Sequence, residues 1–178
     1  NSVIGGGTTA AGMGHIVVMD DSEAQFALTR YSQQLWNKLV PGLPKLAEFE
    51  NCGTIWVAAD DEEMAEVRRK HGFYAERGIR SEILDEASLR AAEPNLRRGL
   101  TGGLLVSGDS VVYQLFATRF LIDTAKRNGA ELMVGKDVVG IDADSVLISD
   151  GTTIKCGSVV NAAGFSAAGL SPGLKIAK

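Results

Sequence analysis

Residues 113–164, YQLFATRFLIDTAKRNGAELMVGKDVVGIDADSVLISDGTTIKCGSVVNAAG, decide the fold of this chain. A helical pattern over residues 113–128 opens the stretch, with apolar side chains on one face and Gly129 directly after it. Glycine at this place ends a helix because it adopts the left-handed backbone conformation at no steric cost. The stretch therefore begins as a helix that buries one face.

Short β-type runs make up the rest of this stretch. The strongest signal is Asp150-Gly151 between the runs 146–149 and 152–155, because this dipeptide favours the positive φ angles of a two-residue hairpin turn. Three further runs predict strands, at residues 130–134, 138–141 and 158–161. The order helix, strand, hairpin, strand predicts one continuous layer and a mixed α/β (α+β) fold class.

The preceding part of the chain alternates helical and strand-like segments. N-terminal caps predict three helices, from Ser22 (with Gln25 in a capping box) to Pro41, from Asp60 to about His71, and from Asp85 to Ala92. Apolar runs predict strands at residues 16–19, 52–58 and 100–107, and residues 81–84 fit either a strand or an extended link. We interpret residues 45–107 as a lobe inserted into a second unit.

Composition and charge limit the classes of partner. The chain has 178 residues and a net charge of −4, so it is unlike a general binder of polyanions. Its basic clusters, Arg68-Arg69-Lys70 and Arg97-Arg98, are short and predict solvated surface. No apolar run approaches the length of a membrane span, and no basic-then-apolar leader is present. We therefore expect no nucleic-acid partner and no membrane span.

Cysteines and acidic clusters give no metal site. Cys52 and Cys156 lie far apart without ligand spacing, which predicts buried free thiols in a reducing compartment and hence a cytoplasmic protein. The acidic runs Asp20-Asp21 and Asp60-Asp61-Glu62-Glu63 precede helices, where capping and first-turn acids are expected. The sequence therefore predicts no bound metal.

The glycine-rich opening, residues 1–15, contains Gly5-Gly6-Gly7-Thr8-Thr9-Ala10, which fits the loose dinucleotide pattern G-x-G-x-x-A. That pattern requires a strand before the glycines and a helix that starts at them. Only Val3-Ile4 precede the glycines, and no crossover helix fits before Ile16. Two interpretations stay open: a loop whose backbone N–H groups and threonine hydroxyls approach a phosphate, or a plain N-terminal tail.

Six segments in order resemble the D-amino acid oxidase–like flavoprotein family, in particular its glycine oxidase and D-amino acid dehydrogenase branch. They are GTTAAGM at 7–13, YSQQLW at 31–36, GTIWVA at 53–58, the pattern L-D…L…E-P-N-L at 84–96, GAE at 129–131 and VVNAAG at 159–164. Each is weak alone, but their order and spacing extend over nearly the whole chain.

The resemblance implies FAD as the cofactor and assigns residues to it. Thr8 and Thr9 would lie beside the diphosphate, with Ala11, Gly12 and Met13 near the flavin; the backbone of Val138 would contact the adenine side, and Ala162, Ala163 and Gly164 would pass close to the cofactor. His15, directly after this loop, is the candidate for a substrate contact. No catalytic acid or base is assigned, because the flavin carries the redox chemistry.

The implied activity is oxidation of an amino acid or secondary amine (a D-amino acid, glycine, sarcosine or a hydroxyproline-like compound) to an imine by hydride transfer to flavin. Residues 1–44 and 108–178 would then be a partial FAD-binding domain and residues 45–107 a partial, β-rich substrate lobe. The family's strand–GxGxxG–helix unit and its later segments have no counterpart in the sequence. We therefore expect an interior fragment that is inactive alone and binds FAD weakly or not at all.

Two questions stay open at this stage. The residues by themselves also fit a non-catalytic α/β domain that serves as a binding or interaction module. They do not report on a homo- or hetero-oligomer.

Overall fold

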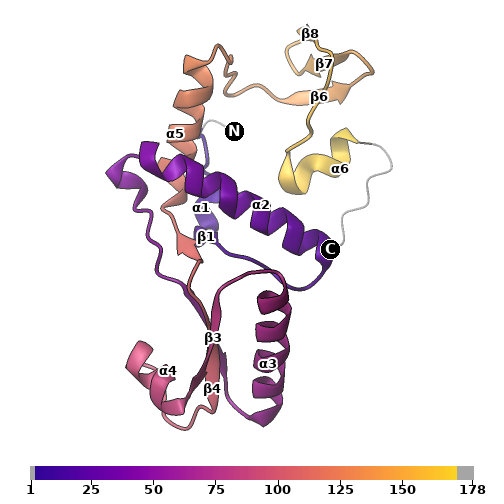
Figure 1. The fold of residues 1–178 in the computed structure, drawn as a ribbon. Helices are drawn as coiled ribbons and strands as arrows, with labels where there is room; N and C mark the ends of the chain where they lie inside the picture. Colours follow the sequence, from indigo (N-terminus) through magenta and orange to yellow (C-terminus); the bar gives the residue numbers. More distant parts are fainter. Residues whose placement is uncertain (1–2, 172–178) are drawn as a thin grey trace.

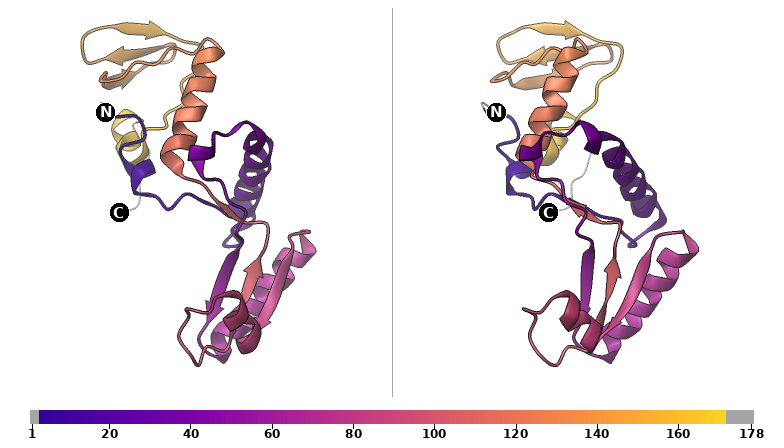
Figure 2. Two further views of the ribbon diagram at one scale, coloured as in Figure 1. Left: turned by 90° about the vertical axis from the view of Figure 1, so that its left-hand side faces the viewer. Right: turned by 60° about the vertical axis from the view of Figure 1, so that its left-hand side comes forward.

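The computed structural model describes residues 3–171, which form three separate antiparallel sheets with helices between and beside them. Figures 1 and 2 show three regions along the long axis, with one sheet at the top, two long helices in the middle and a sheet-based lobe at the bottom. The mixed α/β class is confirmed. The single continuous layer predicted for residues 113–161 is wrong, because the strands there form a small sheet of their own.

The lobe is built on a three-stranded sheet in the order β2 (Thr54–Ala58), β4 (Gly102–Val106), β3 (Ser81–Asp85). Helix α3 (Asp61–Glu76) packs on one face, and α4 (Glu86–Ala92) packs near the other (Figure 1). Leu104 and Val106 face the α3 side, while Leu89 and Leu100 make the core on the α4 side. The lobe is therefore a sheet with apolar cores on both faces.

The lobe's helices begin at the predicted caps. The side chain of Asp60 accepts from the Glu63 N–H at 2.9 Å, and that of Asp85 accepts from the Ser88 N–H at 2.7 Å. Helix α3 continues past the predicted end at His71. The part beyond His71 contains Gly72, and a glycine inside a helix costs about 1 kcal/mol. The packing of Tyr74, which is fully buried, outweighs this cost.

The middle region contains α2 (Glu23–Leu39), two 3₁₀ turns (Val40–Gly42 and Lys45–Ala47), the one-turn helix α1 (Thr8–Ala11) and α5 (Gln114–Arg127). The predicted N-cap is confirmed, since Ser22 Oγ accepts from the Gln25 N–H at 3.2 Å. Strand β1 (His15–Ile16) pairs with β5 (Ser110–Val111). This strand is shorter than the predicted run 16–19, because the next residues bond to side chains of other elements instead of to a strand.

The top region is the antiparallel sheet β6 (Val138–Ile141), β7 (Ser145–Ile148) and β8 (Thr153–Lys155). The predicted hairpin is confirmed, but its turn is not the two-residue form. Ile148 N–H donates to Thr152 O at 2.9 Å, and of the turn residues only Gly151 has a positive φ, of 87°. The bond between Ile148 and Thr152 closes a loop of three residues, 149–151. Within it, the Asp150 side chain accepts from the Thr152 N–H and from Lys136.

Two predicted strands, 130–134 and 158–161, are not formed. An extended segment becomes a strand only when a neighbour pairs with its backbone, and within residues 3–171 no strand pairs with either segment. Their apolar side chains are correspondingly exposed, with Val160 at 88%. The short 3₁₀ turn Gly164–Ser166 and helix α6 (Ala167–Leu170) follow the second segment.

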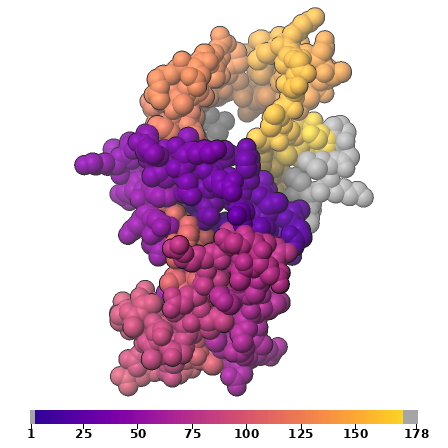
Figure 3. All heavy atoms as spheres, in the orientation of Figure 1, coloured from indigo at the N-terminus to yellow at the C-terminus, as the bar shows by residue number. Residues whose placement is uncertain are grey.

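Figure 3 shows that the lobe, the α2 region and the β6–β8 region follow one another from the bottom to the top of the view. Within the part of the chain that is described, no helix is both long enough and apolar enough to cross a lipid bilayer.

Candidate cofactor site

The threonine- and glycine-rich segment lies on and after α1, whose single turn starts directly after Gly7. As predicted, no crossover helix lies between the glycines and Ile16, because the four residues of α1 are too few for the long helix of a dinucleotide fingerprint. The five predicted cofactor residues of this segment, Thr8, Thr9, Ala11, Gly12 and Met13, are all exposed.

Contacts from the start of α5 hold this segment in place. The Gln114 side-chain amide donates to Gly12 O at 2.6 Å and to Ala10 O at 3.4 Å. Gly14 has φ +68°, and a Cβ there would lie 1.9 Å from Val112 O, so only glycine fits. This close approach fixes the chain at its crossing with the residues that precede α5.

The next residue, His15, pairs in register with Val111 in the β1–β5 ladder. Its side chain is exposed. The structure thus places His15 between the α1 segment and the junction with the lobe. Its predicted contact with substrate stays a prediction.

The second group of predicted residues is brought together at the top region. Val138, Ala162 and Ala163 line one cavity of about 370 Å³. The cavity's other lining residues are Ile141, Val146, Val159, Val160, Asn161 and Leu170. Gly164, with φ +56° and open space where a Cβ would lie, follows at the start of the 3₁₀ turn. The wall of this cavity is therefore apolar apart from Asn161, with branched aliphatic side chains beside the two alanines.

Asn161 fixes the loop that carries the small residues. Its side-chain amide donates to Ala167 O at 2.9 Å and to Ser171 Oγ at 2.8 Å, and its Oδ1 accepts from the Ala163 N–H at 3.3 Å. The sequence analysis did not assign Asn161 a role. The signal was present, because an amide side chain between two valines and two alanines needs hydrogen-bond partners.

The residues present fit a cofactor such as FAD in chemical type. The cavity at Val138, Ala162 and Ala163 offers an aliphatic, apolar wall without charged side chains, which suits a flat ring system. Thr8 and Thr9 offer exposed hydroxyls and first-turn N–H groups, which suit a phosphate. The two groups lie on separate elements, since α1 packs against α5 whereas α6 packs against β6.

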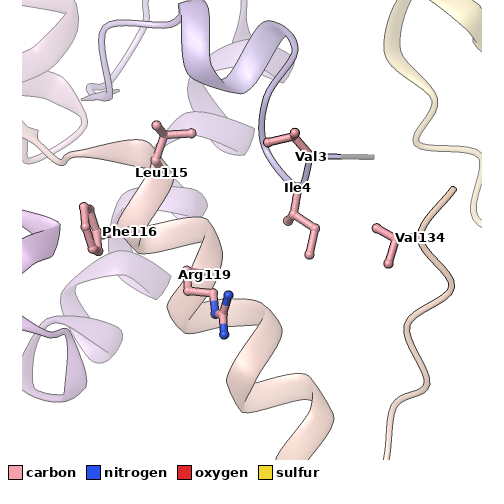
Figure 4. A pocket seen from close by; sticks show the side chains of 6 residues that line it. All are labelled: Val3, Ile4, Leu115, Phe116, Arg119 and Val134. Atoms are coloured by element: carbon pink, nitrogen blue, oxygen red, sulfur yellow. The ribbon is translucent and has the colours of Figure 1, made fainter. Parts of the chain in front are cut away.

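A groove of about 510 Å³ lies between the N-terminal residues, α5 and the unpaired segment 130–134 (Figure 4). Its lining is Val3, Ile4, Leu115, Phe116, Arg119 and Val134. Arg119 is the one charged side chain of that lining and bonds to Asp123 at 2.9 Å. The segment 130–134 beside the groove belongs to no sheet, so the apolar side chains of the lining are left uncovered.

Two sequence predictions about acids and thiols are corrected. Asp20 does not cap α2; its buried carboxylate forms ion pairs with Arg69 and Lys70 of α3. Cys52 is exposed and Cys156 is half-buried, so neither is the buried thiol that the sequence predicted. Across residues 3–171 no three His, Cys, Asp or Glu side chains are grouped to hold a metal ion.

The class of protein to which this fold and its small-residue loops belong can be identified from known protein families. The sequence profile of the DAO family, described as FAD dependent oxidoreductase, matches residues 1–177. The chain belongs to this family, and the resemblance read from the sequence is confirmed.

Two curated proteins are similar to this chain in sequence. A hydrogen cyanide synthase subunit, HcnC, of Pseudomonas protegens is 28% identical over 173 residues, covering 89% of this chain and 42% of the relative. The L-2-hydroxyglutarate dehydrogenase of Escherichia coli K12 is 32% identical over 94 residues, covering 53% of this chain and 22% of the relative. The chain thus spans less than half the length of the curated relatives that it matches.

Solved structures show the same fold. Glycine oxidase from Geobacillus kaustophilus superposes with a TM-score of 0.81 at 24% identity, covering 93% of this chain and 48% of that one. L-Proline dehydrogenase from P. horikoshii superposes with a TM-score of 0.75 at 23% identity, covering 85% and 41%.

Proposed function

We propose that the protein containing this chain is an FAD-dependent enzyme that oxidises the amine of an amino acid or of a secondary amine to an imine. The observation that carries the proposal is the family match over residues 1–177. The names of two structural neighbours, glycine oxidase and L-proline dehydrogenase, favour an amine among the family's substrates.

The flavin, when bound, would accept a hydride from the substrate carbon, while the amine loses a proton and becomes the imine. This chain's own residues would bind and orient the cofactor. Thr8 and Thr9 would donate to the diphosphate, and Ala11, Gly12 and Met13 would border the flavin. His15 would contact the substrate.

The apolar cavity supports the other half of this assignment. The backbone of Val138 would contact the adenine side, and Ala162, Ala163 and Gly164 would let the main chain come close to the cofactor. Residues 1–44 and 108–178 would form part of the FAD-binding domain and residues 45–107 part of the substrate lobe. The 178-residue chain alone would bind FAD weakly and be inactive, and we propose a cytoplasmic location without a nucleic-acid partner.

Two other functions are alternatives with different outcomes. The match to L-2-hydroxyglutarate dehydrogenase over 94 residues favours a 2-hydroxy acid in place of an amine. A non-catalytic binding or interaction domain is the alternative outside enzymes; the exposed apolar residues of segments 130–134 and 158–161 favour it.

The test is anaerobic reduction of the protein expressed from its full reading frame and supplied with FAD. Glycine, sarcosine, D-amino acids and hydroxyproline are offered separately, with L-2-hydroxyglutarate as the competing substrate, and flavin absorbance is followed. Bleaching by an amine supports the proposal, and bleaching by the hydroxy acid alone transfers it to the alternative. A protein that takes up no flavin and is reduced by nothing refutes the enzyme assignment.

A pair of matched variants tests the cavity. Ala163→Leu fills space in the wall of the proposed cofactor site, whereas Ala91→Leu places the same side chain on the exposed face of α4. We expect the first to weaken FAD binding about tenfold or more and the second to leave it unchanged, as measured by flavin fluorescence. Equal affinities of the two variants would remove Ala163 from the site.

A further inference from the structure

Asp109, in the turn between β4 and β5, is a buried carboxylate at the junction of the lobe and the middle region. Its residue exposure is 1%. Its Oδ1 accepts from the Val18 N–H and from the Gln33 side-chain amide, each at 3.2 Å. Its main-chain carbonyl accepts from the Gly53 N–H at 3.0 Å and from the Asn51 side-chain amide at 2.8 Å. One residue therefore joins the chain leading into β2, helix α2 and the segment around Val18.

That segment, residues 17–20, is the linker between β1 and the start of α2. Its successive groups bond to different elements. The Val18 carbonyl accepts from the Tyr74 hydroxyl of α3 at 3.2 Å, and the Met19 N–H donates to Thr29 Oγ1 of α2 at 3.1 Å. Asp20 pairs with Arg69 and Lys70 of α3. The linker is thus held against the lobe on one side and α2 on the other.

The linker is also the covalent continuation of the proposed cofactor segment. Thr8 to His15 precede it directly, and the β1 ladder that supports them has only two residue pairs, His15 with Val111 and Ile16 with Ser110. A two-pair ladder fixes the direction of a chain weakly. Contacts from the start of α5 hold the segment at Gly12 and Gly14, and the bonds of the 17–20 linker add to them in fixing its position relative to the lobe.

The burial of the Asp109 carboxyl costs free energy, which makes aspartate an unfavourable residue for a purely structural contact. Its Oδ2 is buried and has no hydrogen-bond partner among residues 3–171. The two nearby cations of α3 are held by Asp20, and the groups that face Asp109 are the side chains of His15, Gln33 and Thr54. Burial accordingly raises the pKa of the Asp109 carboxyl, even though hydrogen bonds oppose the rise. Such a group contributes geometric specificity more than stability.

We propose that Asp109 is a positioning residue: it holds the 17–20 linker, and through it residues Thr8–His15, at a fixed place against the lobe. The proposal rests on the proposed function only in that the positioned segment is the one assigned to FAD. The carboxylate acts through Val18 and does not touch the reacting atoms.

Amide hydrogen exchange of the protein expressed from its full reading frame, measured without added cofactor or substrate, tests the positioning. Asp109→Ala removes the acceptor of the Val18 N–H, and we expect the protection of that amide to fall about tenfold or more. Asp109→Asn keeps a side-chain oxygen there and is expected to restore protection. The amides of Leu104 and Val106 in β4 report the lobe as a whole, and the exposed Asp150→Asn is the matched control.

A fall confined to the linker and α1, rescued by asparagine, supports the inference. A uniform fall that includes β4, or unchanged protection at Val18, overturns it. The same variants of the full-length protein are compared in FAD affinity by flavin fluorescence. Asp109→Ala is expected to weaken FAD binding at least fivefold, with recovery in Asp109→Asn, which corresponds to about 1 kcal/mol of lost binding. Unchanged FAD affinity also overturns it. If the protein takes up no flavin, the proposed function fails, and exchange alone decides the inference.

Discussion

Asp20 offers the sharpest test of how the two regions of this chain hold together. Its carboxylate side chain is only 2% exposed and forms ion pairs with Arg69 and Lys70, while the Tyr74 hydroxyl lies at 3.4 Å. Lys70 is largely buried, and its other acidic neighbour, Glu66, is 4.0 Å away. Asp20→Asn keeps the shape of the side chain and removes its charge, which leaves a buried ammonium without its counter-ion.

The expected loss follows from the exposure of each partner. The bond from Lys70, whose side chain is 15% exposed, contributes about 2 kcal/mol as a charge-assisted hydrogen bond. Arg69 is 50% exposed and keeps Glu66 at 2.7 Å, so its share is about 0.5 kcal/mol. We therefore expect Asp20→Asn to lower the free energy of unfolding by about 2.5 kcal/mol near neutral pH.

The stabilisation that Asp20 provides is expected to decrease as the pH falls. Burial raises the pKa of Asp20, but the hydrogen bonds from Lys70 and Arg69 and their charges outweigh it, so the pKa lies below its ordinary value. An acid with a lowered folded pKa stabilises the fold above its unfolded pKa of 3.8, and this stability is lost as the pH falls through the folded value. The difference between wild type and Asp20→Asn should therefore shrink in acid.

Equilibrium urea unfolding, followed by tryptophan fluorescence, measures this difference. Trp56 is a suitable probe because Lys70 Nζ lies 4.6 Å from the centre of its ring. The matched control is Asp21→Asn, which removes the same charge from the exposed neighbouring residue. A loss below about 0.5 kcal/mol, or one no larger than that of the control, would refute the reasoning from burial.

Three further substitutions test the packing described above by the same urea measurement. Gly14→Ala should destabilise by about 3 kcal/mol or more, because a Cβ would lie 1.9 Å from Val112 O; Gly108→Ala, with open space at its Cβ, should cost under about 1 kcal/mol, and equal losses would contradict the argument. Tyr74→Phe should cost about 1–3 kcal/mol by removing the donor to a buried carbonyl, and a neutral result would show that water replaces it. Leu104→Ala should cost about 2–5 kcal/mol, since the side chain is fully buried in the β4 core; a smaller loss would mean that α3 collapses onto the cavity.

Local chemistry made much of the fold predictable. Asp60, Asp85 and Ser22 cap their helices as expected, because capping depends on residues within one turn. The small residues Ala162 and Ala163 were assigned to a cofactor loop through the family resemblance, and the structure places them with Val138 at one cavity. The assignment of these residues to FAD itself stays a prediction.

Asp20 and Asp109 show what local chemistry leaves open. Asp20 belongs to an acidic run before a helix, where capping or first-turn acids are expected, yet it pairs with two cations from a helix about fifty residues further on. Asp109 lies in an unremarkable Ser-Gly-Asp-Ser turn, and its partners come from residues 18 and 33. Neither pairing leaves a periodic signal in the sequence.

By itself the sequence determined the family, the mixed α/β class, the helix starts and the β7–β8 hairpin, because each depends on short-range spacing or on an ordered set of motifs. Only the tertiary structure decided which extended runs become strands. Residues 102–106, with two glycines, pair on both sides and are largely buried, whereas 130–134 and 158–161 hold at least as many valines and remain unpaired. A strand needs hydrogen-bonding partners on another segment, and this requirement is a property of the assembled chain, not of the run.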